Sequence, residues 1–220
     1  MNFKKAKTSI EGLTLIELLV VIAIIAILAA MVLPIFETEK GSHQVQCLSN
    51  QHQIAIGFII FEDDHAGRFP AQVAVTNGGA FEIISNGSAA AQFQILSSYL
   101  SKRPGLLVCP VDKTRHPAAN FSELKNENIS YFVNLDAITN VNSILSGDRH
   151  LGLGGKTASA GIFVQTTNMP FTWSGGFHGG PGKPYGVLSF GDGHAQVVRA
   201  TDLNLLLQAQ PLETNRFCFP

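Results

Sequence analysis

Apolar residues follow one another almost without interruption over residues 18–33, after a short leader that carries three lysines and one glutamate. The 21 residues of segment 13–33 would form a helix about 31 Å long, which is enough to cross the hydrocarbon core of a bilayer. Basic residues tend to remain on the cytoplasmic side of a membrane, so we expect the leader inside and the rest of the chain outside. Glu17 interrupts the apolar pattern. Because a carboxylate in a bilayer is costly, we expect it to have a partner.

After Pro34 the pattern becomes amphipathic. Apolar residues recur at spacings near three and four, with glutamine and serine between them: Val45, Leu48, Ala55, Phe58, Ile59 and Phe61. This periodicity predicts that the helix continues and lays one face against a folded domain. The whole predicted helix is about 48 residues long, with a bend at Pro34 and an end before Gly67 and Pro70.

Shorter elements are predicted in the rest of the chain. Residues 89–100 fit a helix, and strands are expected within 102–110, 129–133, 143–149 and 161–165. Two β-prone runs at 185–190 and 195–199 predict a hairpin, because the Asp192-Gly193 pair between them tolerates the positive φ angles of tight turns. One long helix followed by short strands predicts an α+β fold, with the helix packed on a small antiparallel sheet and with loop-rich insertions.

Composition narrows the choice of partners. The chain has 220 residues and a formal net charge of −1, and without the charges of the leader 12 basic and 15 acidic residues remain, a net charge of −3. The sequence has no cluster of Lys and Arg interleaved with aromatic residues, so no nucleic acid is expected as a partner. The 21 glycines and 10 prolines indicate a loop-rich domain.

Three cysteines, Cys47, Cys109 and Cys218, would lie in an oxidising compartment if the chain has this topology. Cys47 belongs to the predicted helix and Cys109 to the end of a predicted strand, so a disulfide that ties the globular domain to the helix is one expectation. The alternative is that both are small, buried apolar residues. No pair of cysteines has the two-residue gap of a zinc knuckle.

Residues 12–20, Gly-Leu-Thr-Leu-Ile-Glu-Leu-Leu-Val, resemble the prepilin N-terminal motif of type IV pilins and type II secretion pseudopilins. In that family a prepilin peptidase cuts after the glycine and methylates the new N-terminus, which implies processing between Gly12 and Leu13. The family most often has Phe where this chain has Leu13. Glu17 and Pro34 become the fifth and twenty-second residues after the cut, positions at which pilin-like proteins commonly carry Glu and Pro.

The resemblance implies that Glu17 pairs with the N-terminal amine of a neighbouring subunit and sets the register of a filament. The alternative for Glu17 is a carboxylate near the helix start that is stabilised by the positive end of the helix dipole.

The implied protein is a structural subunit of a type II secretion pseudopilus or a type IV pilus-like filament. It would be anchored once in the inner membrane, with its C-terminal domain in the periplasm or in a cell-surface filament. The implied parts are a leader at 1–12, a transmembrane and assembly helix at 13–33, an amphipathic helix stem at 34–62 and a globular extracytoplasmic head at 63–220. The implied partners are a prepilin peptidase, other pilin-like subunits, a platform protein and an assembly ATPase.

A second resemblance lies near the C-terminus, where His178-Gly179 precedes a predicted strand and then Asp192-Gly193. The same family has a C-terminal signature of this kind with a shorter gap than the 13 residues between His178 and Asp192, and an insertion at 181–184 would explain the difference. Residues 146–150, Ser-Gly-Asp-Arg-His, resemble a Gly-Asp-Arg element of that family.

These C-terminal residues also echo fragments of metallophosphoesterase motifs. The candidate metal ligands are His150, His178, His194, Asp148 and Asp192. That fold needs an alternating α/β core and a further Asn-His pair, which this sequence lacks, so we expect no enzymatic activity. We expect Asp192 and Gly193 to form a structural turn, His178 to hydrogen-bond to the backbone, and no cofactor; a weak structural calcium at Asp192 is the alternative.

A competing function is a membrane-tethered binding module that is cleaved but does not polymerise. It would bind a secreted substrate or a glycan through residues 173–177, where Trp173, with Phe171 and Phe177 nearby, would stack on a sugar. An aromatic cluster of this kind is more often part of a core.

Overall fold

The structure is a computed structural model that describes residues 14–153, 156–166, 169–174, 178–179, 182 and 184–220, except for the side chains of residues 32–41, 153 and 156. The chain divides into two compact units, residues 1–42 and residues 43–220. The first helix, α1 (Leu15–Asp64), contributes to both units and is 50 residues long, which confirms the predicted long helix.

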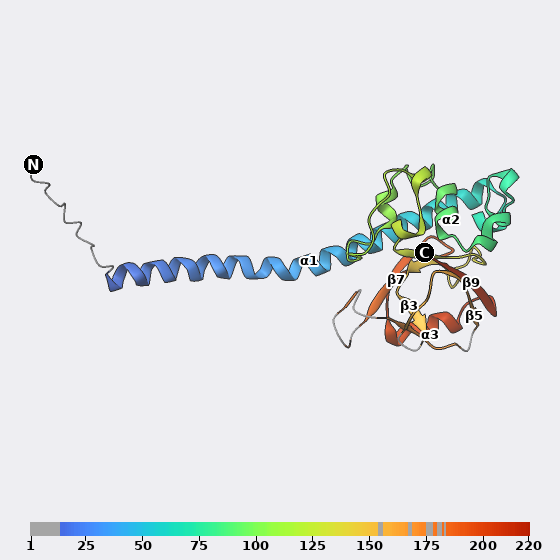
Figure 1. The fold of residues 1–220 in the computed structure, drawn as a ribbon. Coiled ribbons are helices and arrows are strands. Elements are labelled where there is room, and N and C mark those ends of the chain that lie inside the picture. The colour runs from blue at the N-terminus through green and yellow to red at the C-terminus, as the bar shows by residue number, and fades with distance from the viewer. Residues whose placement is uncertain (1–13, 154–155, 167–168, 175–177, 180–181, 183) are drawn as a thin grey trace, which may run out of the picture. The chain divides into compact units, whose positions relative to one another are not determined.

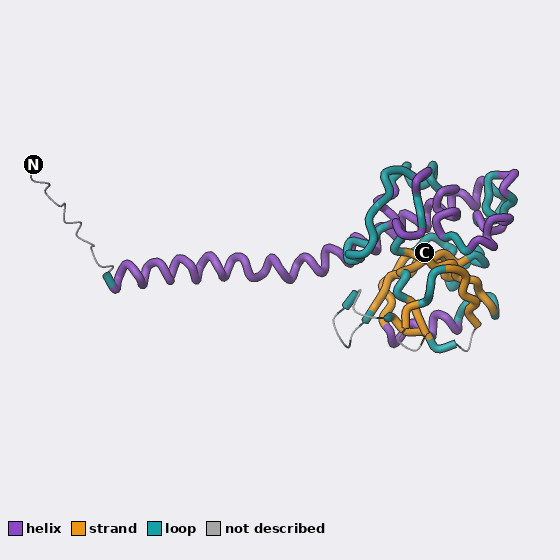
Figure 2. The backbone as a smooth tube through the Cα atoms, in the orientation of Figure 1, coloured by secondary structure: helices purple, strands orange, loops and turns teal. Residues whose placement is uncertain are grey.

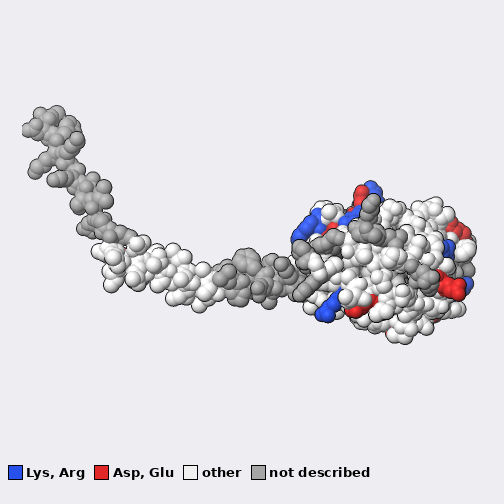
Figure 3. Space-filling model, turned by 90° about the horizontal axis from the view of Figure 1, so that it is seen from below, with Lys and Arg blue, Asp and Glu red and all other residues white. Residues whose placement is uncertain are grey.

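In the first unit, α1 exposes apolar side chains on every side. From Leu15 to Met31, the large apolar residues are between 49% and 81% exposed. Figure 3 shows this part of the helix without a visible acidic or basic side chain on the face in view. Across the residues that the structure describes, no helix is both long and apolar enough to cross a membrane.

The second unit contains a six-stranded antiparallel sheet, which confirms the α+β class. In spatial order its strands are β5 (Gly161–Thr166), β9 (Thr214–Phe219), β1 (Tyr131–Asn134), β2 (Ile144–Asp148), β7 (Tyr185–Phe190) and β8 (Ala195–Arg199). A second sheet has the order β4 (Lys156–Thr157), β3 (Leu151–Leu153), β6 (Phe171–Trp173). Within this unit the strands gather in one half, and the end of α1 with the short helices and loops fills the other (Figure 2).

The central strands are buried on both faces, because successive side chains of a strand point to opposite sides. Tyr131 and Val133 of β1 join a core cluster with α1 residues such as Phe58, whereas Phe132 between them joins a second cluster. That second cluster includes Leu203 and other residues of helix α3 (Ala200–Gln208). Figure 1 accordingly shows helix α2 (Ala89–Ile95) and α3 on opposite sides of the sheet.

The hairpin predicted around Asp192-Gly193 is confirmed as β7 and β8, which pair in antiparallel register. Gly193 has φ +91°, a backbone conformation that residues with a Cβ rarely adopt. The turn lies against α1, where His52 Nδ1 is 3.0 Å from the carbonyl oxygen of Gly193. Ser189 of β7 donates a buried hydrogen bond of 2.9 Å to Gln51 of the same helix, so α1 is held to the sheet by polar contacts as well as by apolar packing.

The strand expected within 102–110 is absent from these fully described residues. Residues Pro104–Leu107 form a single 3₁₀ turn instead, because Pro104 favours the first position of a helical turn and cannot donate a ladder hydrogen bond. Further 3₁₀ turns lie at Pro70–Gln72, Val75–Asn77, Phe81–Asn86, Phe121–Glu123 and Asn126–Asn128. These turns account for much of the weakly periodic sequence between the long helix and the sheet.

Candidate functional site

The N-terminal turn of α1 contains a capping box formed by Thr14 and Glu17. The Glu17 amide donates to Thr14 Oγ1 (3.3 Å), and Glu17 Oε2 in return accepts from the Thr14 amide (2.8 Å) and hydroxyl (2.7 Å). This reciprocal pair satisfies two donors that would otherwise have no partner at a helix start. The Thr-x-x-Glu spacing of these two residues is the sequence signature of such a box.

The other N-terminal candidates are placed less completely. Gly12 and Leu13 lie outside the described residues, as does the side chain of Pro34. The capping box uses no atom N-terminal to Thr14, so a cut after Gly12 would leave it intact.

A disulfide joins Cys47 on α1 to Cys109 on the loop that follows the Pro104–Leu107 turn. The two Cα atoms are 5.5 Å apart, within the usual range for a bridge. Both cysteines are fully buried. The third cysteine, Cys218 on β9, is buried away from this pair, and its burial raises the pKa of the thiol to about 11.

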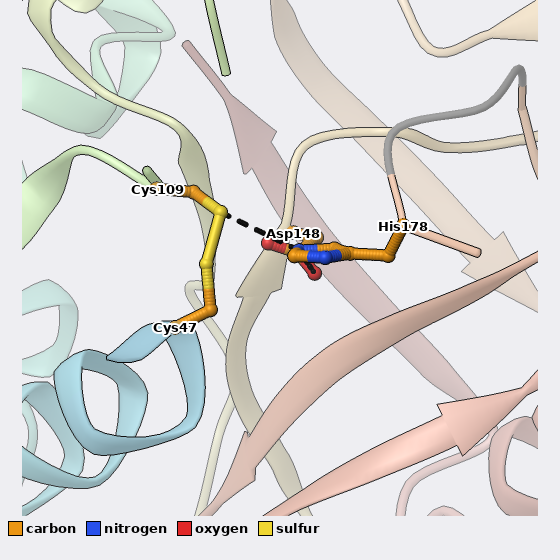
Figure 4. A group of neighbouring side chains, drawn as sticks. All are labelled: Cys47, Cys109, Asp148 and His178. Atoms are coloured by element: carbon orange, nitrogen blue, oxygen red, sulfur yellow. Dashed lines mark hydrogen bonds and ion pairs between the residues drawn. A yellow bond between two sulfur atoms is a disulfide. The ribbon is translucent and has the colours of Figure 1, made fainter. Parts of the chain in front are cut away.

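His178 and Asp148 lie against this disulfide (Figure 4). His178 Nε2 is 3.4 Å from Cys109 Sγ and 3.3 Å from Asp148 Oδ2. The His178 ring stacks on Tyr185 at a centroid distance of 5.2 Å, and the two residues also form an isolated antiparallel bridge. The imidazole therefore contacts side chains of the core, and the expected bond from this side chain to the backbone stays a prediction.

Asp148 is fully buried and has an asymmetric environment. Its Oδ2 accepts a hydrogen bond of 2.7 Å from the Val187 amide, whereas its Oδ1 is buried without a hydrogen-bond partner in the described structure. The Tyr131 hydroxyl donates to Cys47 Sγ at 3.8 Å on the other side of the bridge. Burial and then the charge of Asp148 raise the pKa of Tyr131 well above its usual value, so this hydroxyl remains a donor.

The Gly147-Asp148-Arg149 element has a distinct structural role for each residue. A Cβ on Gly147 would lie 2.3 Å from Leu188 Cδ2 and 2.9 Å from Phe132 Cε1, so a larger residue would force these buried side chains to move. Arg149 points to the Asp112 carboxylate, with Nε to Oδ2 at 2.8 Å and Nη2 to Oδ1 at 3.2 Å.

Asp112 lies at the centre of a hydrogen-bond network that the sequence analysis missed. Its carboxylate also accepts from the hydroxyls of Thr114 (2.7 Å) and Ser130 (2.9 Å). Burial alone raises the pKa of Asp112, but hydrogen bonds from Arg149, Thr114 and Ser130 outweigh it and hold that pKa at about 2. Burial, followed by the charge of Arg149, lowers the pKa of the neighbouring His150 to about 4.

The five candidate metal ligands do not meet at one point among the described residues. Asp192 Oδ1 accepts from the amide and the ring of His194 in the hairpin turn, whereas Asp148 and His178 lie at the disulfide. Within the described part of the chain, the only group of at least three His, Cys, Asp or Glu side chains with the spacing of a metal site is Cys47, Cys109, Asp148 and His178. Asp192 belongs to no such group. Among the described residues, a calcium ion at the hairpin turn would therefore have no set of side-chain ligands.

The aromatic residues proposed for sugar stacking are placed in the core. Trp173 is 5% exposed and Phe171 is 1% exposed. A Cβ on Gly186 would lie 2.5 Å from the Trp173 ring, which shows how closely the β7 backbone packs on it. Phe177 lies outside the described residues. Neither Trp173 nor Phe171 offers a face to a sugar.

Comparison with known proteins gives one match. Residues 8–33 match the family model of the prokaryotic N-terminal methylation motif. No curated protein and no solved structure matches the chain. The matched segment contains the capping box and the exposed apolar turns of α1. The chain thus carries the prokaryotic N-terminal methylation motif, and this motif supports membership of the type IV pilin-like and pseudopilin family.

Proposed function

We propose that this chain is a structural, non-catalytic subunit of a type II secretion pseudopilus or a type IV pilus-like filament. The observation that carries the proposal is the methylation motif at residues 8–33, of which the part from Leu15 to Met31 is a helix that exposes its large apolar side chains. A helix of this kind is stable only when lipid or other apolar helices cover it. A filament subunit meets both surroundings, first the inner membrane and then the helices of neighbouring subunits.

In this proposal prepilin peptidase cuts after Gly12 and methylates Leu13, and residues 13–33 anchor the chain before assembly. A platform protein and an assembly ATPase supply the machinery. The folded unit at 43–220 is then the part displayed in the periplasm or on a filament.

Glu17 has a dual role in the proposed cycle. In the single chain its carboxylate is held by Thr14 in the capping box. During assembly the positively charged N-terminus of a neighbouring subunit provides a stronger, charge-assisted partner for the same carboxylate. The capping box thus stabilises the carboxylate until the next subunit arrives.

Replacing Glu17 tests this role. We expect Glu17→Ala to be cleaved and recovered in the membrane fraction like the wild type, but to be lost from sheared filaments when expressed with its native assembly system. Asp63→Asn is the matched control, because Asp63 is an exposed carboxylate on α1 outside the apolar segment. Unchanged incorporation of Glu17→Ala would contradict the proposal and favour a tethered, non-polymerising binding module.

The processing step is tested separately by intact-mass and N-terminal peptide mass spectrometry of the protein from its native membrane fraction. We expect a start at N-methyl-Leu13. An uncut Met1, or a cut after the apolar run, would overturn the filament assignment.

A further inference from the structure

Four side chains that are remote in sequence meet at the Cys47–Cys109 disulfide. They come from α1, the loop that ends the Pro104–Leu107 turn, the end of β2 and the segment before β7. Each offers one ligand atom, and the atoms of Cys47, Cys109, Asp148 and His178 all lie within 4.8 Å of one another. All four residues are buried, with exposed fractions between 0% and 3%.

The distances suit tetrahedral coordination once the disulfide is open. Zinc binds thiolate, imidazole and carboxylate with arms of about 2.0–2.3 Å, so neighbouring ligand atoms lie about 3.3–3.8 Å apart. His178 Nε2 is already 3.4 Å from Cys109 Sγ and 3.3 Å from Asp148 Oδ2. The two sulfurs are bonded to each other, and after reduction they need to separate to about 3.7 Å.

The surroundings of the group also suit a metal. Asp148 Oδ1 is a buried carboxylate oxygen without a hydrogen-bond partner in the described structure, and the Val187 amide fixes the other oxygen. The Tyr131 hydroxyl points to Cys47 Sγ and would stabilise a thiolate there. Such outer hydrogen bonds orient the ligands of a metal site and tune their basicity.

We propose that the reduced form of this chain binds one Zn²⁺ ion through Cys47, Cys109, His178 and Asp148. A newly made chain carries thiols, so no reductant is needed to reach this form. Binding releases one proton from each thiol and leaves two thiolates, one carboxylate and one neutral imidazole around the ion.

Metal binding and the disulfide exclude each other, because both use the same two sulfurs. When a second disulfide exchanges with the two thiolates, it takes two electrons and leaves as two thiolates, the Cys47–Cys109 bond forms and the ion loses two of its four ligands. The ion would therefore hold the two cysteines side by side until they are oxidised. This inference concerns the folded unit at 43–220 and does not depend on filament assembly.

Cobalt binding provides the test, because tetrahedral thiolate-bound Co²⁺ has distinctive visible and near-ultraviolet absorption. Full-length Cys218→Ala protein in detergent micelles, which has no third thiol, is reduced with a phosphine. The phosphine gives two electrons to the disulfide, takes an oxygen from water and leaves two thiols. The protein is unfolded, then refolded without oxygen with Co²⁺ or Zn²⁺. We expect one ion per reduced chain, with a thiolate-to-cobalt charge-transfer band, and none for the oxidised chain.

Two pairs of variants separate the site from adventitious binding. His178→Ala and Asp148→Asn should weaken metal binding by at least about tenfold. His194→Ala and Asp192→Asn are the matched controls, because these residues form a similar His–Asp pair in the exposed hairpin turn, and they should bind the ion like the parent. Circular dichroism of the oxidised forms identifies any variant that fails to fold.

A second measurement does not depend on variants. Diamide added to the Zn²⁺-loaded protein should release one Zn²⁺ for each disulfide formed, as followed with a chromogenic chelator. Absence of the charge-transfer band, equal binding by site and control variants, or retention of zinc after the bridge has formed would each overturn the proposal.

Discussion

At the scale of single residues, two buried aspartates of the same unit have opposite hydrogen-bond environments. Asp112 receives hydrogen bonds from Arg149, Thr114 and Ser130. Asp148 receives one from the Val187 amide, and its second oxygen has no hydrogen-bond partner in the described structure. The first arrangement serves stability, because every added donor favours the charged carboxylate. The second arrangement leaves a buried carboxylate oxygen without a donor. This lowers the stability of the folded chain unless another state of the protein, such as a metal-bound state, uses that oxygen.

Asp112 should contribute to stability in a pH-dependent way. Its pKa is about 2 in the folded chain and near 3.8 without the fold, so the unfolded chain binds the proton more tightly. The contribution is present above about pH 4 and is lost as the pH falls towards about 2; it amounts to about 2 kcal/mol. Asp112→Asn should lower the unfolding free energy at pH 7 by about this amount and flatten its acid dependence.

Urea unfolding in detergent micelles between pH 2 and pH 7 measures this effect. Asp63→Asn removes an exposed carboxylate on α1 and serves as the control, with little expected change. A parallel acid dependence in Asp112→Asn and the wild type would show that Asp112 does not carry it.

The sequence alone could not reveal the Asp112–Arg149 and Cys109–His178 contacts. Asp112 and Thr114 are two residues apart and give a local turn signal. Arg149 is 37 residues from Asp112 in the sequence, and the two meet only because the fold of the sheet brings them together. His178 is 69 residues from Cys109. Candidate chemistry at His178 and Asp148 was visible in the sequence, whereas their position at the disulfide depends on the order of the strands.

At the scale of elements, the β7–β8 hairpin was predictable because its signal is local. The Asp-Gly pair fixes the turn, and the runs on either side fix the register. The hairpin also lies against α1, since a Cβ on Gly193 would be 3.3 Å from Ile56 Cδ1.

Gly193→Ala should therefore destabilise the unit by about 1–2 kcal/mol, because alanine is strained at φ +91° and its methyl group crowds Ile56. Thermal unfolding should show a fall in Tm of about 2–4 °C per kcal/mol. Gly105→Ala is the matched control, since its Cβ would meet no atom within 4 Å. Equal Tm values for the two variants would contradict this account of the turn.

Strand β9 and helix α3 were not predicted, although both have weak signals. Phe217 and Phe219 alternate and are buried, and Leu203 and Leu207 are four residues apart and buried. Each signal is short and stands next to polar residues, so periodicity alone does not separate it from a loop. Strand β9 gains its order by pairing with β1 on one side and β5 on the other.

At the scale of the whole chain, the long helix and the α+β class follow from pattern. The Cys47–Cys109 bridge was one of two alternatives in the sequence, because only three-dimensional proximity distinguishes a disulfide from two separate buried thiols. The division at residue 42 separates the exposed apolar turns of α1 between Leu15 and Met31 from a unit with two extensive cores. Within the larger unit, Cys47 and Cys109 close a long loop that supplies many residues of the first of these cores.

Reduction of this bridge should lower stability substantially. The two cysteines are 62 residues apart, and loop-closure entropy for this length corresponds to about 4 kcal/mol. We expect metal-free Cys218→Ala protein to lose about this unfolding free energy when a phosphine reductant and a chelator are added. The Cys47→Ala/Cys109→Ala variant, measured with and without the reductant, is the control and should not respond; an equally stable reduced parent would contradict the prediction.

The same bridge has a mechanical consequence. If the chain is pulled from its two ends, tension passes from Cys47 directly to Cys109 through the S–S bond. The segment between the two cysteines, which are 62 residues apart in the sequence, then cannot be extended. At about 3.4 Å per extended residue, this segment has roughly 200 Å of contour length that does not contribute to stretching. A displayed domain with this link would extend under load only outside the loop, so the part of α1 between Cys47 and Asp64 would carry none of the pull along the chain.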